Sequence, residues 1–155
     1  IISPAELPLY CVAAPTHAFA GQRTVKLSEV RKQAIVVQSR ALSIRRMLDE
    51  QHAWVFEDGP PPVVTNSLQL LKQLVVGGRY VALTSEMDAA PELIGGSLSA
   101  LKVKARGISA QSISVAVSAR RTLPRIANEV ANCLAEEASA MLDEVRTAQG
   151  SQREF

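Results

Sequence analysis

The chain has 155 residues, 47% hydrophobic and 21% charged, which is the composition of a soluble globular domain with a buried core. Its 17 basic and 15 acidic residues give a net charge of only +2, which excludes nucleic-acid binding by this segment as the default function. No apolar run reaches the roughly 18 to 20 residues that cross a bilayer, and the first residues lack the pattern of a secretion signal. We therefore expect no membrane partner and a cytoplasmic location.

Apolar runs alternate with helical patterns along the first half of the chain. The sequence predicts strands over residues 9–14, 34–37, 63–64 and 81–84, and helices over 27–33, 39–51 and 66–76. A Gly-Pro-Pro-Pro run at 59–62 forbids regular structure before the third strand. The helix from Asn66 to Val76 has the clearest bounds. Asn66 or Ser67 can cap its first N–H groups, and Gly77 or Gly78 can supply a left-handed residue at its end.

The second half has fewer elements and ends in a long helix. A Gly-Gly pair at 95–96 predicts a turn, and strands are expected over 98–103 and 113–119, the latter with one covered face. Thr122 and Pro124 indicate a helix start, so we expect a helix from about Pro124 to about Val145 and a tail without a role from Gly150 to Phe155. The expected apolar stripe of this helix comprises Ile126, Val130, Leu134, Met141, Leu142 and Val145.

Polar groups follow three of the predicted strands. Strands alternating with helices predict an α/β fold with a largely parallel sheet, in which ligands bind where strand ends meet helix starts. The three junctions are Gln38-Ser39-Arg40, Thr65-Asn66-Ser67 and Thr84-Ser85. If the strands are neighbours, these groups converge on one crevice, where Arg40 could pair with a carboxylate and the hydroxyls could orient it. Each could equally be a plain helix cap.

Other reactive residue types favour packing over chemistry. Cys11 lies in an apolar strand and Cys133 in a helical pattern, so both are expected to be small core residues in a reducing compartment. His17 has no carboxylate nearby in sequence, which favours a structural role in its loop. Two histidines without a Cys or carboxylate cluster make no metal site. We expect no catalytic residues, no metal and no cofactor.

Basic residues gather between positions 93 and 128, where no acidic residue occurs. This zone could attract an anionic partner or could be a solvated face balanced by the acids at 129–144. The six basic residues are Lys102, Lys104, Arg106, Arg120, Arg121 and Arg125.

Four motifs occur in a characteristic order: a strand running into Pro15 and His17, Leu27-Ser28-Glu29-Val30, the glycine-closed helix 66–76, and Gly96-Ser97-Leu98. Together, over about residues 9–145, they resemble the effector-binding domain of LysR-type transcriptional regulators. The resemblance implies a periplasmic-binding-protein-like (type 2) fold of two lobes, with a small-molecule effector held between them. It also implies a homodimer or tetramer on DNA, which the wide apolar surface of helix 66–76 could mediate.

The resemblance also points to particular effector contacts. It implicates Ser39, Arg40 and Leu42 after the strand 34–37, and Thr65 and Asn66 after the strand 63–64. Thr84 stands where the family strand runs on toward a Leu-Pro pair, and Ser85 replaces that Pro here.

The family order places a winged helix-turn-helix, a linker helix and part of the first lobe before the segment that this chain resembles. Residues 1–14 are then expected to be a hinge strand and crossing from the first lobe, and 15–90 the second lobe. Residues 91–150 would complete the second lobe and return to the first with the C-terminal helix, and 151–155 would be a tail. DNA would be bound only through a domain absent from this chain. Apolar faces of 113–119 and of the last helix would be exposed.

Two other functions remain open at the level of sequence. A periplasmic solute-binding protein of the same fold, serving transport, would require an export signal on the full-length chain. An enzyme on this fold would require an acid, base or nucleophile set, and no convincing set is present.

Overall fold

The structure is a computed structural model that describes residues 2–151. Its elements are β1 (Ile2–Leu7), β2 (Leu9–Ala13), β3 (Thr24–Lys26), α1 (Leu27–Val30), β4 (Ala34–Gln38), α2 (Ser43–His52), the 3-10 helix η1 (Ala53–Val55), β5 (Val63–Thr65), α3 (Leu68–Val76), β6 (Tyr80–Ser85), α4 (Ala90–Gly95), β7 (Ser99–Lys104), β8 (Gln111–Val115) and α5 (Arg125–Ser151). Helices and strands alternate through most of the chain, as an α/β fold requires.

Six strands form the central sheet, in the order β3-β7-β2-β6-β4-β5. β4 is parallel to both β5 and β6, and β3 is parallel to β7. β2 runs antiparallel to its two neighbours, β6 and β7. The prediction of a largely parallel α/β sheet is therefore confirmed, with β2 as the exception.

The strands of this sheet are apolar on both faces because helices cover both faces. Along β4, Ile35 and Val37 pack toward α1, α2 and η1, whereas Val36 between them packs toward α3, α4 and α5. This alternation is the ordinary period of a strand. It explains why the strands read as continuous apolar runs in the sequence rather than as alternating ones.

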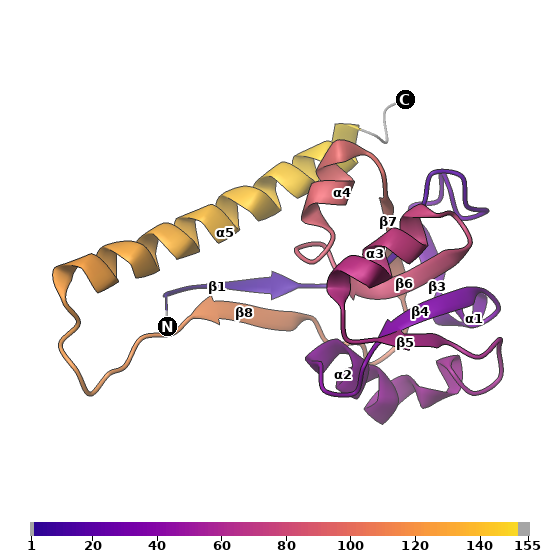
Figure 1. Ribbon diagram of the computed structural model, residues 1–155, viewed down its shortest axis with the longest axis horizontal. Coiled ribbons are helices and arrows are strands. Elements are labelled where there is room, and N and C mark those ends of the chain that lie inside the picture. The colour runs from indigo at the N-terminus through magenta and orange to yellow at the C-terminus, as the bar shows by residue number, and fades with distance from the viewer. Residues whose placement is uncertain (1, 152–155) are drawn as a thin grey trace.

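A second, two-stranded sheet pairs β1 with β8 in antiparallel register. In Figure 1 this ribbon and the first part of α5 run side by side and extend to one side of the central sheet, while the C-terminal part of α5 lies against α4. With 27 residues, α5 is about 40 Å long. The ribbon and α5 thus form an arm attached to the six-stranded body.

Several predicted bounds are wrong. The helix expected over 39–51 begins at Ser43, because residues 39–42 form a turn closed by Leu42 N–H donating to the Ser39 carbonyl at 3.0 Å. The strand expected over 113–119 is β8, which ends at Val115. The last helix continues past Val145 to Ser151, so Gly150 is helical and not part of a tail, while residues 152–155 lie outside the described range.

The expected burial of the two cysteines and the expected exposure of the last helix can be compared with the structure. Cys133 is exposed and so is not a core residue, whereas Cys11 is fully buried. The expected exposure of the last helix is confirmed, because three apolar residues of its stripe are more than half exposed: Ile126, Val130 and Leu134. The division into residues 1–14, 15–90, 91–150 and 151–155 stays a prediction.

Candidate ligand-binding site

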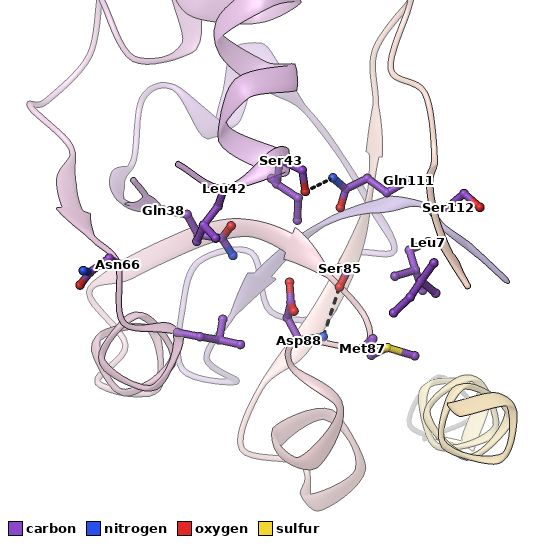
Figure 2. A pocket seen from close by; sticks show the side chains of 13 residues that line it. Leu7, Gln38, Leu42, Ser43, Asn66, Ser85, Met87, Asp88, Gln111 and Ser112 are labelled. Atoms are coloured by element: carbon purple, nitrogen blue, oxygen red, sulfur yellow. Dashed lines mark hydrogen bonds between the residues drawn. The ribbon is translucent and has the colours of Figure 1, made fainter. Parts of the chain in front are cut away.

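A hollow of about 620 Å³ lies between the body and the β1–β8 ribbon (Figure 2). Its walls come from the ends of β4 and β6, the starts of α2 and α3, and the inner part of the ribbon. The polar lining residues are Gln38, Ser43, Asn66, Ser85, Asp88, Gln111 and Ser112, and the apolar ones are Leu7, Leu42, Ile44, Leu68, Met87 and Ile113. Asp88 is the one charged residue in this lining. The hollow is therefore rich in neutral hydrogen-bonding groups.

Parallel pairing brings the strand ends to one edge of the sheet. β4 pairs in parallel with β6 on one side and with β5 on the other. The three strands therefore end at the same edge of the sheet. Just beyond the strands, Ser39 N–H donates to the carbonyl of Thr65 at 2.9 Å, which fixes two of the junctions side by side. The three strands are therefore neighbours, which is the condition for their junctions to converge. Polar groups at such an edge are placed where α/β proteins bind ligands.

The two helix starts at the hollow differ in how their N–H groups are satisfied. At α3, Ser67 Oγ accepts from Leu70 N–H at 3.2 Å, and Thr65 Oγ1 accepts from Ser67 N–H at 3.0 Å. At α2 the capping position is Leu42, whose side chain makes no capping bond. The first N–H groups of a helix have no partner within the helix and carry partial positive charge. α2 therefore offers the more open donor set, and Ser43 and Ile44 in its first turn line the hollow.

A side-chain hydrogen bond links the ribbon to the body across the opening. Gln111 Nε2 on β8 donates to Ser43 Oγ at the start of α2, at 2.8 Å (Figure 2). On the opposite wall, Asp88 N–H donates to Ser85 Oγ at 3.2 Å, and Thr84 Oγ1 donates to Asp88 Oδ2 at 2.7 Å. These bonds hold Ser43, Asp88 and Gln111 in fixed positions around the space.

The structure brings two of the six sequence-predicted site residues into the lining, Leu42 and Asn66. In Figure 2, Asn66 stands at one rim, far from Leu7 and Ser112 at the other. Ser39 and Thr65 lie beside each other and are not in the lining. Thr84 is fully buried and reaches the hollow only through its bond to Asp88.

Arg40, the sixth, points elsewhere. Its side chain is 80% exposed, and its Nε lies 2.9 Å from Asp49 Oδ2, a carboxylate that also accepts from Arg45 Nε at 2.7 Å. Ion pairing with Asp49 of α2 thus accounts for its position here.

Sequence reasoning missed several lining residues, for two different reasons. Gln38 and Ser85 belong to the predicted junctions and could have been selected, because each is a polar residue at the end of an apolar strand. Gln111 and Ser112 follow the junctions by many residues and come to the hollow only through pairing of β8 with β1, which no local pattern reveals. Ser43 was hidden by the wrong start assigned to its helix.

Residues considered for catalysis are engaged in packing. Cys11 is fully buried in β2, and burial raises the pKa of its thiol to about 12. His17 Nδ1 accepts from Phe19 N–H at 3.1 Å, and burial lowers the pKa of the imidazole. Within residues 2–151, no group of three His, Cys, Asp or Glu is placed to hold a metal ion, and no helix is long and apolar enough to cross a membrane.

Comparison with solved structures shows the fold. The regulatory domain of MetR from N. meningitidis matches with a TM-score of 0.57 and 15% identity, over 89% of this chain and 66% of that one. The CcmR regulatory domain from Synechocystis, in complex with 2-PG, matches with a TM-score of 0.62 and 16% identity, over 88% and 68%. The effector-binding domain of QuiR, in complex with shikimate, matches with a TM-score of 0.56 and 12% identity, over 96% and 66%. The chain thus spans about two thirds of these domains.

These matches confirm the periplasmic-binding-protein-like type 2 fold, whose six-stranded sheet is flanked by helices. A search of curated protein sequences gives no significant match. At the level of sequence families, the model of the LysR substrate binding domain matches residues 5–139. Domains of this kind are regulatory and bind ligands without acting as enzymes. The chain belongs to the family of LysR substrate-binding domains.

Proposed function

We propose that this chain is the effector-sensing domain of a LysR-type DNA-binding transcriptional regulator that works in the cytoplasm. The observation that carries the proposal is the convergence of two helix starts, two strand ends and β8 around one hollow of about 620 Å³, whose lining combines apolar side chains with neutral polar groups. A volume of this size suits a small molecule, and the site sits at the edge where such folds bind ligands. The small molecules in complex with QuiR and CcmR support the same kind of occupant.

We infer that the effector is a small hydroxylated carboxylic acid. Its carboxylate would accept from the open first turn of α2 and from Gln111, and a second polar group of the ligand would bond to Asn66 at the other rim. Its hydroxyl groups would bond to Asp88, whose Oδ2 is already held by Thr84. A highly charged anion fits less well, because no Lys or Arg lies in this lining and Asp88 adds a negative charge.

The proposal is tested by calorimetric titration of the chain with hydroxylated carboxylic acids. Asn66→Ala and Gln111→Ala should each weaken binding roughly five- to tenfold, the usual loss for a hydrogen bond to a charged group. Gln22→Ala is the matched control, because Gln22 is exposed in the loop before β3, away from the lining and from α3. Absence of binding, or equal affinity in all three variants, would contradict the proposed site.

The candidate contacts outside the lining are Ser39, Arg40, Thr65 and Thr84. A substitution of Arg40 tests this group best. Its long, exposed side chain could leave Asp49 and turn toward a bound carboxylate. In the same titrations, Arg40→Ala should weaken binding at least fivefold if this turn occurs. Unchanged affinity would remove Arg40 from the site while leaving the α2 contacts in place.

Effector binding would act on DNA through a domain outside this chain. Such coupling requires the effector to favour one arrangement of the regulator over another. The alternative function is a solute-binding protein of the same fold that serves transport, which would bind its ligand in the same hollow. The reading frame upstream of Ile1 separates the two, since a DNA-binding domain and an export signal have unmistakably different sequences.

We further propose that the chain forms a homodimer or tetramer through α3. Leu71 and Val75 on this helix are fully buried against the sheet, yet Leu70 and Val76 remain 45% and 43% exposed. Exposed apolar side chains on a helix surface favour a protein partner. Light scattering of Leu70→Glu tests the proposal, because a charge in the interface should dissociate the oligomer. Leu134→Glu on the exposed stripe of α5 is the comparison, and dissociation by that change alone would exclude α3.

A further inference from the structure

A second hollow, of about 830 Å³, lies at the far edge of the central sheet from β5. It is bounded by the end of β3 and the start of α1, by the end of β7, and by the junction of α2 with η1. It shares no lining residue with the first hollow. Its charged and aromatic lining residues are Lys26, His52, Trp54, Lys104 and Arg106.

Strand pairing places like charges next to each other in this hollow. β3 and β7 are parallel with Lys26 opposite Lys104, and both side chains are exposed. Like charges directly opposite one another on a sheet are destabilising. Arg106 adds a third cation two residues beyond Lys104, and no Asp or Glu lies in the lining. An anion at this position would relieve the repulsion.

The cations are available to such an anion. Among residues 2–151, none of Lys26, Lys104 and Arg106 lies within 4.0 Å of a carboxylate in an ion pair, whereas six other basic residues do. Glu29 is near in sequence, but its Oε2 accepts from the backbone N–H of Lys26 at 2.9 Å and so serves the start of α1. The basic zone noted in the sequence is therefore not neutralised at this end of β7.

The other wall is aromatic and contains an unsatisfied polar atom. His52 is 8% exposed, and its Nε2 is buried with no hydrogen-bond partner within the described range. Trp54 meets His52 edge-to-face, with ring centroids 6.4 Å apart, and the guanidinium of Arg31 lies 5.7 Å from the Trp54 ring. Buried polar groups normally have partners, so an unpaired imidazole nitrogen beside a basic hollow is a second sign of a ligand.

We propose that this hollow is a second ligand site, for a small molecule that carries a phosphate group on an aromatic or apolar body. Two lysines and an arginine match the two negative charges of a phosphate monoester better than the single charge of a carboxylate. The body of the ligand would lie against Trp54. This inference does not depend on the effector proposed for the first hollow.

Trp54 makes the site directly observable, because it is the single tryptophan of the chain. Its fluorescence can be followed while inorganic phosphate, phenyl phosphate or benzoate is added at constant ionic strength, so that general salt screening does not change. We expect saturable changes with both phosphates, tighter binding of phenyl phosphate than of inorganic phosphate, and weaker binding of benzoate. A linear response to phosphate, or benzoate binding as tight as phenyl phosphate, would overturn the proposal.

Two charge-matched variants separate a site from diffuse attraction. Lys104→Gln should weaken phenyl phosphate binding roughly tenfold, because it removes one charge-assisted contact. Lys102→Gln removes the same charge from the same strand, but Lys102 is not in the lining. The affinity of this variant for phenyl phosphate should therefore stay within about twofold of that of the native chain. Equal weakening by both changes would show general electrostatics and refute the site.

Thermal unfolding provides a readout that does not depend on fluorescence. Without ligand, Lys104→Gln should melt at a higher temperature than the native chain, since it removes the repulsion with Lys26. With phenyl phosphate the native chain should gain more stability than the variant. A ligand-induced gain that is equal in the two proteins would contradict a contact to Lys104.

Discussion

Gly78 ends α3 and turns the chain into β6. Its φ is +87°, a left-handed conformation that favours glycine, and a Cβ added there would lie 2.8 Å from Thr16 Oγ1. Gly78→Ala should therefore lower the free energy of unfolding by about 1 to 2 kcal/mol, as the left-handed strain alone costs about that much. Urea denaturation followed by circular dichroism measures the change.

The neighbouring glycine is the natural control for this prediction. Gly77 has an ordinary right-handed φ of −61°, and the nearest atom to an added Cβ would be the Leu74 carbonyl oxygen at 3.4 Å. Gly77→Ala should change the stability by less than about 0.5 kcal/mol. Two equal losses would show that the left-handed backbone of Gly78 is not what closes the helix.

The two cysteines should differ sharply in reactivity. Only thiolates react rapidly with disulfide reagents, and Cys11 is fully buried with its pKa raised to about 12. Cys133 is exposed on α5. Ellman's reagent at neutral pH should thus modify one thiol per folded chain and two in urea. Rapid modification of Cys11 in the folded state would mean that β2 opens far more readily than its central place in the sheet implies.

At the scale of elements, the sequence predicts best where local signals act alone. The bounds of α3 follow from Ser67 and Gly77, and the apolar runs of β4 and β6 indicate buried strands. α2 was expected four residues too early, because Ser39 resembles a cap although the chain turns once more before Ser43. β3 and α4 are short elements held mainly by tertiary pairing and packing, and their sequences carry no distinct period.

Arg146 joins α5 to the body by an ion pair and to the ribbon by a hydrogen bond. Arg146 Nη2 lies 2.6 Å from Glu86 Oε1 and also donates to the Glu6 carbonyl at 3.3 Å. Its hydrogen bond to Glu86 is the main reason that the pKa of Arg146 is raised. Glu86 is fully buried, and its other oxygen, Oε2, has no hydrogen-bond partner among the described residues.

Arg146→Met should therefore destabilise the chain by about 3 kcal/mol, because it leaves a buried carboxylate without its cation. Chemical denaturation measures this loss, and adding Glu86→Gln to the same chain should restore part of it. Arg125→Met is the matched control on the same helix. Its pair with Glu129 is mostly exposed, so the change should be below about 0.5 kcal/mol. A similar small effect at Arg146 would mean that α5 is held by its apolar face alone.

For the whole molecule, the sequence located one side of the candidate site and not the other. Asn66 belongs to one of the predicted junctions and Leu42 was indicated by the family resemblance, and the pairing of β4 with β5 and β6 brings both into the lining. The opposite wall comes from β8, whose position depends on pairing with β1 at the other end of the chain. Long-range pairing of this kind leaves no local pattern, so Gln111 and Ser112 became visible only in three dimensions.

The ribbon should be the least stable part of the site. A two-stranded sheet is marginal in isolation, Ile113 of β8 is 38% exposed, and the ribbon is held by α5 and by the bond from Gln111 to Ser43 at 2.8 Å. Loss of that bond removes about 1 kcal/mol, which corresponds to roughly fivefold faster local opening. Gln111→Ala should hence speed hydrogen exchange in β1 and β8 by about this factor and leave β7 unchanged.

Hydrogen exchange with mass spectrometry resolves the ribbon from the central sheet, and Gln22→Ala in the loop before β3 serves again as the control. A ligand that bridges α2 and β8 should act in the opposite direction and slow exchange in the ribbon, because closing the opening stabilises the arrangement that binds it. If Gln111→Ala left exchange in β8 unaltered, the side-chain bridge would not be what holds the ribbon. The effect of ligand binding on α5 would then have to be transmitted through Asp88 and the nearby Glu86.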